Sequence, residues 1–188
     1  MFPRCGKRVP AGWHKAKRTV KLPDASNPVP CSLLRSRPAI AAQLGELCCQ
    51  WSAFEAYLAA MFAHLLLASP LVGDEILENI FDSSKKRAAI VNVANYRVKN
   101  TDDRAALIIL LDEYQRLATQ RSKYVHGRWM VEDKLFPDDA ILIRKVNPKW
   151  SEQAELVSEK TLSDLCGQIV QLGEKFTALV SEDFIARF

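Results

Sequence analysis

The sequence predicts an all-α protein, a helical bundle of about five helices with a small β-hairpin inserted before the last helix. Through most of the chain, apolar side chains recur at spacings of three and four residues, the period of an amphipathic helix. Two short β-prone runs, Trp129–Val131 and Ile141–Ile143, break that period near the C-terminus. The apolar and charged fractions, 48% and 26%, are those of an ordinary globular protein.

The first three helices are predicted in the N-terminal half of the domain. The first runs from about Pro38, which suits a first helical turn, to Ala68, and Ser69-Pro70 is expected to end it. A second, short helix is predicted over Asp74 to Phe81, and a third begins at Ser83 or Ser84, either of which can act as its N-cap. The apolar stripe of the first helix consists of Leu44, Leu47, Trp51, Phe54, Leu58, Phe62 and Leu65.

A fourth helix is predicted from Thr101 to about His126. Thr101 can cap its start, and the next two residues, Asp102 and Asp103, would lie in the first turn, where the helix dipole favours acids. Gly127 follows the last helical residue, which is the position where glycine most often ends a helix.

The hairpin and the last helix complete the predicted fold. The residues Phe136–Asp139 carry the turn signal between the two β-prone runs. The last helix begins near Ser158 or Thr161, where Thr161 and Asp164 resemble a capping box, and it continues to about Phe184.

The chain divides into a basic arm, residues 1–37, and a single domain, residues 38–188. Five prolines and little apolar periodicity within residues 1–30 are typical of an arm, a linker or a disordered segment. Residues 1–38 hold nine Lys or Arg and one acid, a net charge of +8, whereas the rest holds 17 bases and 21 acids, a net charge of −4. Such an arm can bind nucleic acid or an anionic surface, and the alternative is a solvated tail.

Membrane insertion, metal and cofactors are not expected. The longest apolar run, Ala56 to Ala68, has 13 residues, too few to cross a bilayer, and no apolar segment of a signal peptide follows the basic N-terminus. The five cysteines form no C-x-x-C pair and are expected to be reduced, so the chain is expected to be cytoplasmic. A zinc site from Cys5, His14 and Cys31 is an alternative whose spacing matches no zinc pattern.

The segment from Arg121 to Gly127 holds the side chains best suited to chemistry. Arg121 and His126 are five residues apart, a rise of roughly 7.5 Å and a rotation of about 140° on a helix, which an Arg side chain can cover. An imidazole that moves protons, next to a guanidinium that grips phosphate oxygens, suits reactions at phosphate. The alternative is that His126 caps the last helical carbonyls while Arg121 extends from a solvated face.

The pattern R-x4-H-G followed by Trp129, with Trp51-x3-Glu55-x2-Leu58 upstream, resembles the HEPN superfamily, the higher eukaryotes and prokaryotes nucleotide-binding domain. The resemblance spans residues 38–185 in the order and type of the elements. The stretch from Arg121 to Trp129 is the part that is specific to the family motif.

This resemblance implies a helical bundle that forms a homodimer. Many family members are metal-independent ribonucleases, often toxins or antiviral effectors, and a toxin of this kind would have an antitoxin-like protein partner. In those enzymes Arg and His from two subunits line one cleft and act on the 2′-hydroxyl and phosphate of RNA. The resemblance therefore implies that Arg121 holds the phosphate and that His126 is the proton-transfer group.

Three further residues are expected to support this site. Ser122 stands where the family usually has Asn or Asp, and this departure keeps open a non-catalytic dimeric module that binds nucleotide, RNA or a protein partner. Tyr124 lies inside the motif. Glu55 falls on or beside the apolar stripe of the first helix, where a carboxylate needs a partner. Glu55 therefore orients His126 or pairs with Arg121, unless it reaches water at the stripe edge.

Overall fold

The computed structural model describes residues 33–131, 138–146 and 151–180. The arm up to residue 32, the predicted turn residues Phe136 and Pro137, and the expected end of the last helix at Phe184 lie outside the described residues. The order of elements confirms the predicted fold class, a helical bundle with a small antiparallel sheet before the last helix. The elements are η1 (Leu33–Ser36, a 3-10 helix), α1 (Pro38–Leu66), α2 (Pro70–Glu78), α3 (Ser83–Arg97), α4 (Thr101–His126), β1 (Arg128–Met130), β2 (Ala140–Val146), β3 (Ser151–Val157) and α5 (Glu159–Leu179).

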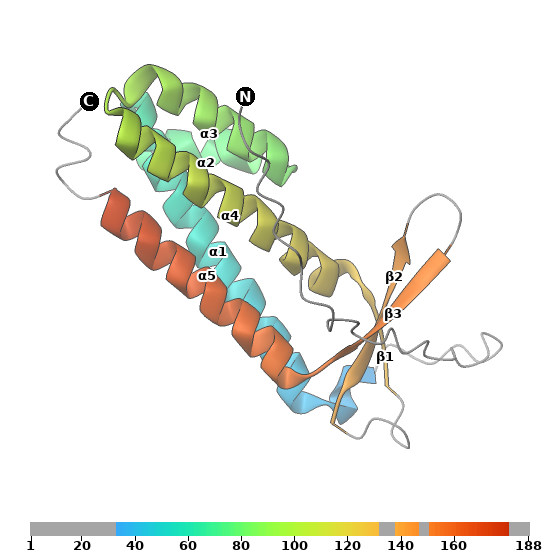
Figure 1. Ribbon diagram of the computed structural model, residues 1–188. Helices are drawn as coiled ribbons and strands as arrows, with labels where there is room; N and C mark the ends of the chain where they lie inside the picture. The colour runs from blue at the N-terminus through green and yellow to red at the C-terminus, as the bar shows by residue number, and fades with distance from the viewer. Residues whose placement is uncertain (1–32, 132–137, 147–150, 181–188) are drawn as a thin grey trace, which may run out of the picture.

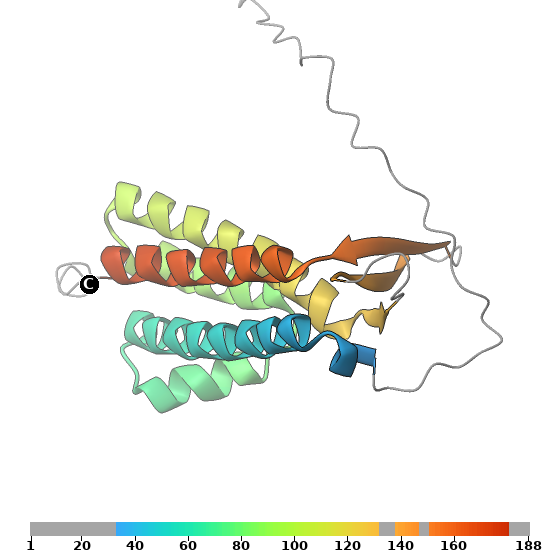
Figure 2. The ribbon, with the colours of Figure 1, turned by 90° about the horizontal axis from the view of Figure 1, so that it is seen from below.

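The described α-helices form an elongated bundle with the sheet at one end (Figure 1). α1 and α5 run side by side along the bundle, and α2 lies on the outer side of α1 (Figure 2). The strands are antiparallel in the order β1-β2-β3. Because β1 follows the end of α4 and β3 leads into α5, the sheet joins the ends of these two helices.

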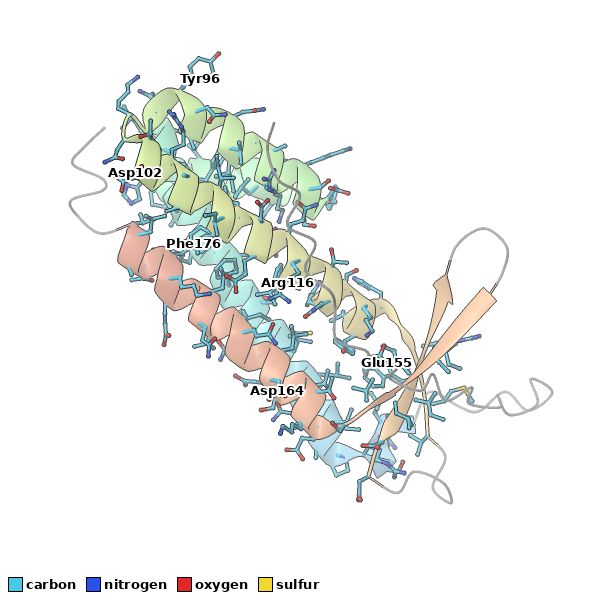
Figure 3. All side chains as sticks on the ribbon, viewed as in Figure 1. Tyr96, Asp102, Arg116, Glu155, Asp164 and Phe176 are labelled. Atoms are coloured by element: carbon cyan, nitrogen blue, oxygen red, sulfur yellow. The ribbon has the colours of Figure 1, made fainter. Side chains whose placement is uncertain are left out.

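The core forms where α1 meets α4 and α5. Six of the seven predicted stripe residues of α1 are buried, and Leu44 is partly buried. The Trp51 ring stacks on Tyr114 of α4, with ring centroids 5.4 Å apart. Phe176 points from α5 into the bundle (Figure 3) and meets Phe54 edge-on at 5.5 Å. Aromatic pairs of this kind contribute about 0.5–1.5 kcal/mol beyond the area that they bury.

α2 begins four residues earlier than the sequence predicted. α1 ends at Leu66, two residues before the predicted end at Ala68, and Pro70 opens α2, because its fixed φ and missing N–H suit the first helical position. The reversal between the helices passes through Leu67, whose φ of 56° lies in the left-handed region. Glycine at position 73 then lets α2 approach α1 closely: a Cβ there would clash with the carbonyl oxygen of Ala59 and lie 2.7 Å from the Cβ of Ala63.

The helix caps are shifted by one residue at two helices. The carboxylate of Asp82, rather than Ser83 or Ser84, accepts the N–H groups at the start of α3, at 2.8 Å from Ser84 N. Asn100, rather than Thr101, caps α4 in the same way. Ser158 caps α5, which confirms the first of the two predicted starts. Acidic and amide oxygens at these positions satisfy backbone donors that the helix leaves unpaired.

β3 was not predicted from the sequence. Its segment Ser151–Val157 reads SEQAELV, which has few of the β-branched and aromatic residues that favour strands. In the structure β3 pairs antiparallel with β2 over seven Cα partners, from Ala140↔Val157 to Val146↔Ser151. The predicted hairpin, β1 with β2, is therefore extended by a third strand, which leaves β2 at the centre of the sheet.

Residues 33–37, which the sequence analysis assigned to the arm, pack against the domain. Arg37 is 8% exposed, and its Nε donates to the carbonyl oxygen of Asp139 at 3.1 Å. This hydrogen bond joins the start of α1 to the start of β2, across 102 residues of sequence. The folded domain therefore includes the short helix η1 as well.

Candidate functional site at the end of helix α4

The last turns of α4 carry four of the residues that the sequence analysis assigned to a site. Arg121 is partly buried, Ser122 and His126 are exposed, and Tyr124 is buried. Arg121 lies seven residues after Tyr114, so the two side chains leave α4 on the same buried face. His126 is the last residue of α4 and its ring is accessible to a ligand.

The guanidinium of Arg121 has an unsatisfied donor. Its Nε is buried, and within the described part of the chain it has no hydrogen-bond partner. A buried donor that has lost its water and found no acceptor costs about 1–3 kcal/mol. An acceptor supplied by a ligand or by a second chain would recover part of that cost.

Several contacts fix the end of α4 on the sheet. Trp129 of β1 donates from Nε1 to the carbonyl oxygen of Tyr124 at 3.0 Å, and the two rings stack at 6.5 Å. Lys123 forms an ion pair with Glu155 of β3, which Figure 3 labels on the sheet beside the end of α4. The Lys123 ammonium also lies 4.8 Å from the centre of the Tyr124 ring. The backbone that carries His126 is therefore held from both sides.

Gly127 follows the end of α4, as predicted, but not in the left-handed conformation usual for glycine there. Its φ of −75° and ψ of 159° are extended. The absence of a side chain matters for a different reason: a Cβ would clash with the Leu142 side chain and lie 2.7 Å from the carbonyl oxygen of Lys123. Glycine here lets β2 pass directly against the end of the helix.

Glu55 does not join this site. Its carboxylate forms an ion pair with Lys86 of α3 at 3.0 Å, and the Tyr114 hydroxyl donates to it at 3.5 Å. Among the described residues neither Arg121 nor His126 contacts it, so the expected pairing of Glu55 with the motif is not found. The position was correctly identified as one that needs a partner, but the partner comes from a helix 31 residues later in the sequence.

Glu55 instead borders a cavity of about 270 Å³ between α1, α2 and α3. Three carboxylates and one ammonium reach this cavity, and apolar groups complete its wall. The residues that line the cavity include Ser52, Glu55, Asp74, Leu77, Glu78 and Lys86.

The environment of Tyr114 predicts a pH effect on stability. Burial, and next the negative charge of Glu55, raise the pKa of the Tyr114 hydroxyl well above its ordinary value of 10.0. Above pH 10 the unfolded chain therefore binds fewer protons than the folded chain, and the free energy of unfolding should fall as pH rises. The slope from this one group reaches about 1.4 kcal/mol per pH unit.

The substitution Tyr114→Phe removes this titration. Urea unfolding at several pH values from 9 to 11 should show a shallower loss of stability in Tyr114→Phe than in the wild type. Tyr96, which points away from the bundle (Figure 3) and is 81% exposed, provides the control, because Tyr96→Phe should keep the wild-type slope. Equal slopes in all three proteins would contradict the assignment.

The sequence around the end of α4 is basic. No Asp or Glu occurs between Glu113 and Glu132. The bases between these two acids are Arg116, Arg121, Lys123 and Arg128.

Two contacts at the end of α4 could not be predicted from the sequence, the ion pair of Lys123 with Glu155 and the approach of Leu142 to Gly127. Both depend on strands that are distant in sequence.

The described residues hold no group of three or more His, Cys, Asp or Glu side chains arranged to bind a metal ion. Cys48, Cys49 and Cys166 are free thiols.

Within the described ranges, no single helix is long and apolar enough to cross a membrane. α1 and α2 reach that length and composition only together, and the bend between them is 116°.

Comparison with known proteins adds no relative. No protein-family model matches the chain, and no curated protein or solved structure is significantly similar to it. The assignment of the site therefore depends on the residues and contacts at the end of α4.

Proposed function

We propose that this chain is a HEPN-like, metal-independent endoribonuclease of the cytoplasm, with Arg121 and His126 as its catalytic pair. The observation that carries the proposal is the buried, unpartnered Nε of Arg121, with the exposed His126 five residues later on the same helix. A phosphate oxygen is the acceptor that this donor lacks, and a guanidinium binds phosphate through parallel hydrogen bonds. The acid-free sequence around the motif supports an anionic ligand as well.

The proposed reaction is transfer within the RNA strand. The 2′-hydroxyl oxygen attacks the adjacent phosphorus, the bond from phosphorus to the 5′ oxygen breaks, and a 2′,3′-cyclic phosphate and a 5′-hydroxyl result. One neutral imidazole accepts the 2′ proton, and one protonated imidazole donates to the leaving oxygen. A homodimer supplies two such groups, His126 and the partner's His126, while Arg121 stabilises the charge on the phosphate oxygens.

A second function follows from Ser122. This exposed side chain stands where the resembling family usually has Asn or Asp, and its hydroxyl reaches less far. A dimer that binds RNA or nucleotide without cleaving it uses the same Arg121 donor and needs no proton transfer. In a toxin–antitoxin pair, the protein partner would cover this end of α4.

A cleavage assay in EDTA tests the proposal. Purified protein should cut RNA with 5 mM EDTA present, on the order of the excess used to strip divalent ions from nuclease sites. It should leave intact the same sequence with 2′-deoxyribose at every position, because the attacking group is then absent. Light scattering should give twice the chain mass of 21.2 kDa.

The outcomes separate the two functions. RNA that is bound but never cut, over a broad panel of substrates, would replace the enzyme with the binding module. Cleavage that is abolished by EDTA, or that also occurs in DNA, would exclude the proposed chemistry. A monomer that still cuts RNA would exclude a site shared between two copies.

A further inference from the structure

The outer face of α2 is apolar and uncovered. Leu71, Val72 and Ile76 lie on it with exposed fractions of 80%, 44% and 39%, while Gly73 and Leu77 turn toward α1. Leu67 precedes this face and Phe81 follows it, and they are 68% and 95% exposed. We call these five exposed residues, Leu67, Leu71, Val72, Ile76 and Phe81, the α2 face. Runs of exposed apolar side chains of this kind typically mark an interaction surface.

Carboxylates lie within and beside the α2 face. At 100° per residue, Glu75 lies between Leu71 and Val72, and Asp74 and Glu78 lie along the edge next to Leu71. Asp82 follows at the start of α3, and all four acids are exposed. No Lys or Arg occurs from residue 38 to residue 84. The occupant of this surface should therefore be apolar and basic.

A second copy of the same face does not meet that requirement. In a two-fold interface the same patch forms both sides, so residue i of one copy contacts residue j of the other and j contacts i. Asp74, Glu75 and Glu78 of one copy would therefore meet a surface with the same acids and no Lys or Arg, and like charges at close range cost free energy.

We propose that the basic N-terminal arm of this chain docks on the α2 face. Residues 1–32 of the arm lie outside the described residues and have the composition that the face lacks: their bases alternate with apolar side chains such as Val9, Trp13 and Val20. The seven bases of residues 1–32 fall between Arg4 and Lys21. The cavity beside α2 adds to the match, because Asp74 and Glu78 also line it and would receive a cation.

The length of the chain allows this docking. α2 contacts α1 near Ala59, about 32 Å along the helix from Pro38 at 1.5 Å per residue. The base-free stretch from Leu22 to Leu33 is a tether that spans up to about 40 Å when extended. The chain between Leu22 and Leu33 is therefore long enough for the basic part of the arm to reach α2 of the same chain.

Docking of this kind is reversible and needs little affinity. Tethering gives an effective concentration of at most about 1 mM, so a contact with a Kd of about 1 mM or below is occupied for a substantial part of the time. Salt should weaken the docking, because its contacts are electrostatic in part. The proposal does not depend on the activity of the α4 site.

Zero-length cross-linking of the full chain tests the proposal. A carbodiimide joins Lys ammonium groups directly to carboxylates. At low salt, Lys15, Lys17 and Lys21 should form more cross-links to Asp74, Glu75 and Glu78 than to the reference acids. These references are the exposed carboxylates of Asp102, Asp164 and Glu174, on α4 and α5. Raising the salt from about 0.05 M to 0.5 M should lower the cross-link yield by roughly threefold or more.

A pair of matched variants tests the apolar part of the contact without removing a carboxylate. Leu71→Ser with Phe81→Ser should lower the cross-links to α2 by roughly threefold or more, because two apolar contacts are lost. Tyr96→Ser with Ile109→Ser changes two large exposed residues elsewhere, 81% and 65% exposed, and should leave the yield unchanged. All four positions are at the surface, so helical circular dichroism should stay at the wild-type level.

Three results would overturn the proposal. The first is a spread of cross-links over α2 and the reference acids in proportion to their exposure. The second is cross-linking to α2 that appears only in species of twice the chain mass on a denaturing gel, which would assign the α2 face to a second copy. The third is a yield that the Leu71→Ser and Phe81→Ser double variant leaves unchanged.

Discussion

Replacing His126 by alanine should lower the rate of RNA cleavage by about 10²–10⁴-fold, the usual contribution of a positioned proton-transfer group. Binding of RNA should change little, because the imidazole acts on the proton and not on the phosphate charge. The measurement is single-turnover cleavage with enzyme in excess, which separates the chemical step from binding. His64→Ala is the control, since His64 is exposed on α1, away from the motif, and its loss should leave the rate unchanged.

Arg121 should respond differently. Arg121→Ala removes the guanidinium proposed to contact phosphate, so RNA binding and cleavage should both weaken. Arg121→Lys should fail to restore cleavage, because an ammonium group cannot form the two parallel hydrogen bonds of a planar guanidinium. The double variant with His126→Ala should cleave about as slowly as the worse single variant, because the two groups act as a unit. Ser122→Asn restores the usual family residue and should hold or raise the rate.

A His126→Ala protein that cuts RNA at the wild-type rate would remove the imidazole from the mechanism. Arg97 is exposed on α3, so Arg97→Ala removes a positive charge away from the motif. If Arg97→Ala lost as much cleavage as Arg121→Ala, overall positive charge would explain the effect and the motif would not.

Gly73→Ala should produce the largest loss of stability among the glycine-to-alanine substitutions in the helices. The new Cβ would meet the Ala59 carbonyl oxygen, and it would lie 2.7 Å from the Ala63 Cβ and 2.9 Å from the Ala63 nitrogen. These are backbone and Cβ atoms, which cannot rotate away, so α2 must shift from α1. Overpacking of this kind costs about 1–3 kcal/mol, which outweighs the gain of about 0.5–1 kcal/mol from alanine in a helix.

Gly45 and Gly167 provide the controls for this prediction. Both lie inside helices, α1 and α5, and a Cβ at either position would meet nothing within 4 Å. Gly45→Ala and Gly167→Ala should therefore stabilise the protein by about 0.5–1 kcal/mol each. Thermal unfolding followed by circular dichroism should place Gly73→Ala below the wild type and the two controls above it. A Gly73→Ala protein as stable as Gly45→Ala would show that the contact yields easily.

The long helices could be predicted because their information is local. The stripe of α1 repeats at helical spacing, and its members are buried where α4 and α5 cover them. Positions that depend on a distant segment could not be predicted in the same way. Pro70 looked only like a stop signal, because its role in opening α2 depends on the left-handed turn at Leu67.

The same distinction applies to the candidate site. Arg121 and His126 lie on one helix, so their spacing was visible in the sequence. The partner of Glu55 was not, because Lys86 comes from α3 and no local pattern connects the two. The ion pair of Glu155 with Lys123 could not be predicted either, since it depends on the register of β3, a strand with a weak sequence signal.

The pairing of α1 with α5 has a consequence for synthesis of the chain on the ribosome. α1 is the first long helix to be made, and α5, which covers part of its apolar stripe, is the last (Figure 2). About 110 residues separate the ends of these helices, which takes roughly 6–22 s at the usual rate of translation. During that time Phe54 of the stripe lacks its contact with Phe176 of α5. The nascent chain should therefore offer a binding site to chaperones that the released protein closes within its own core.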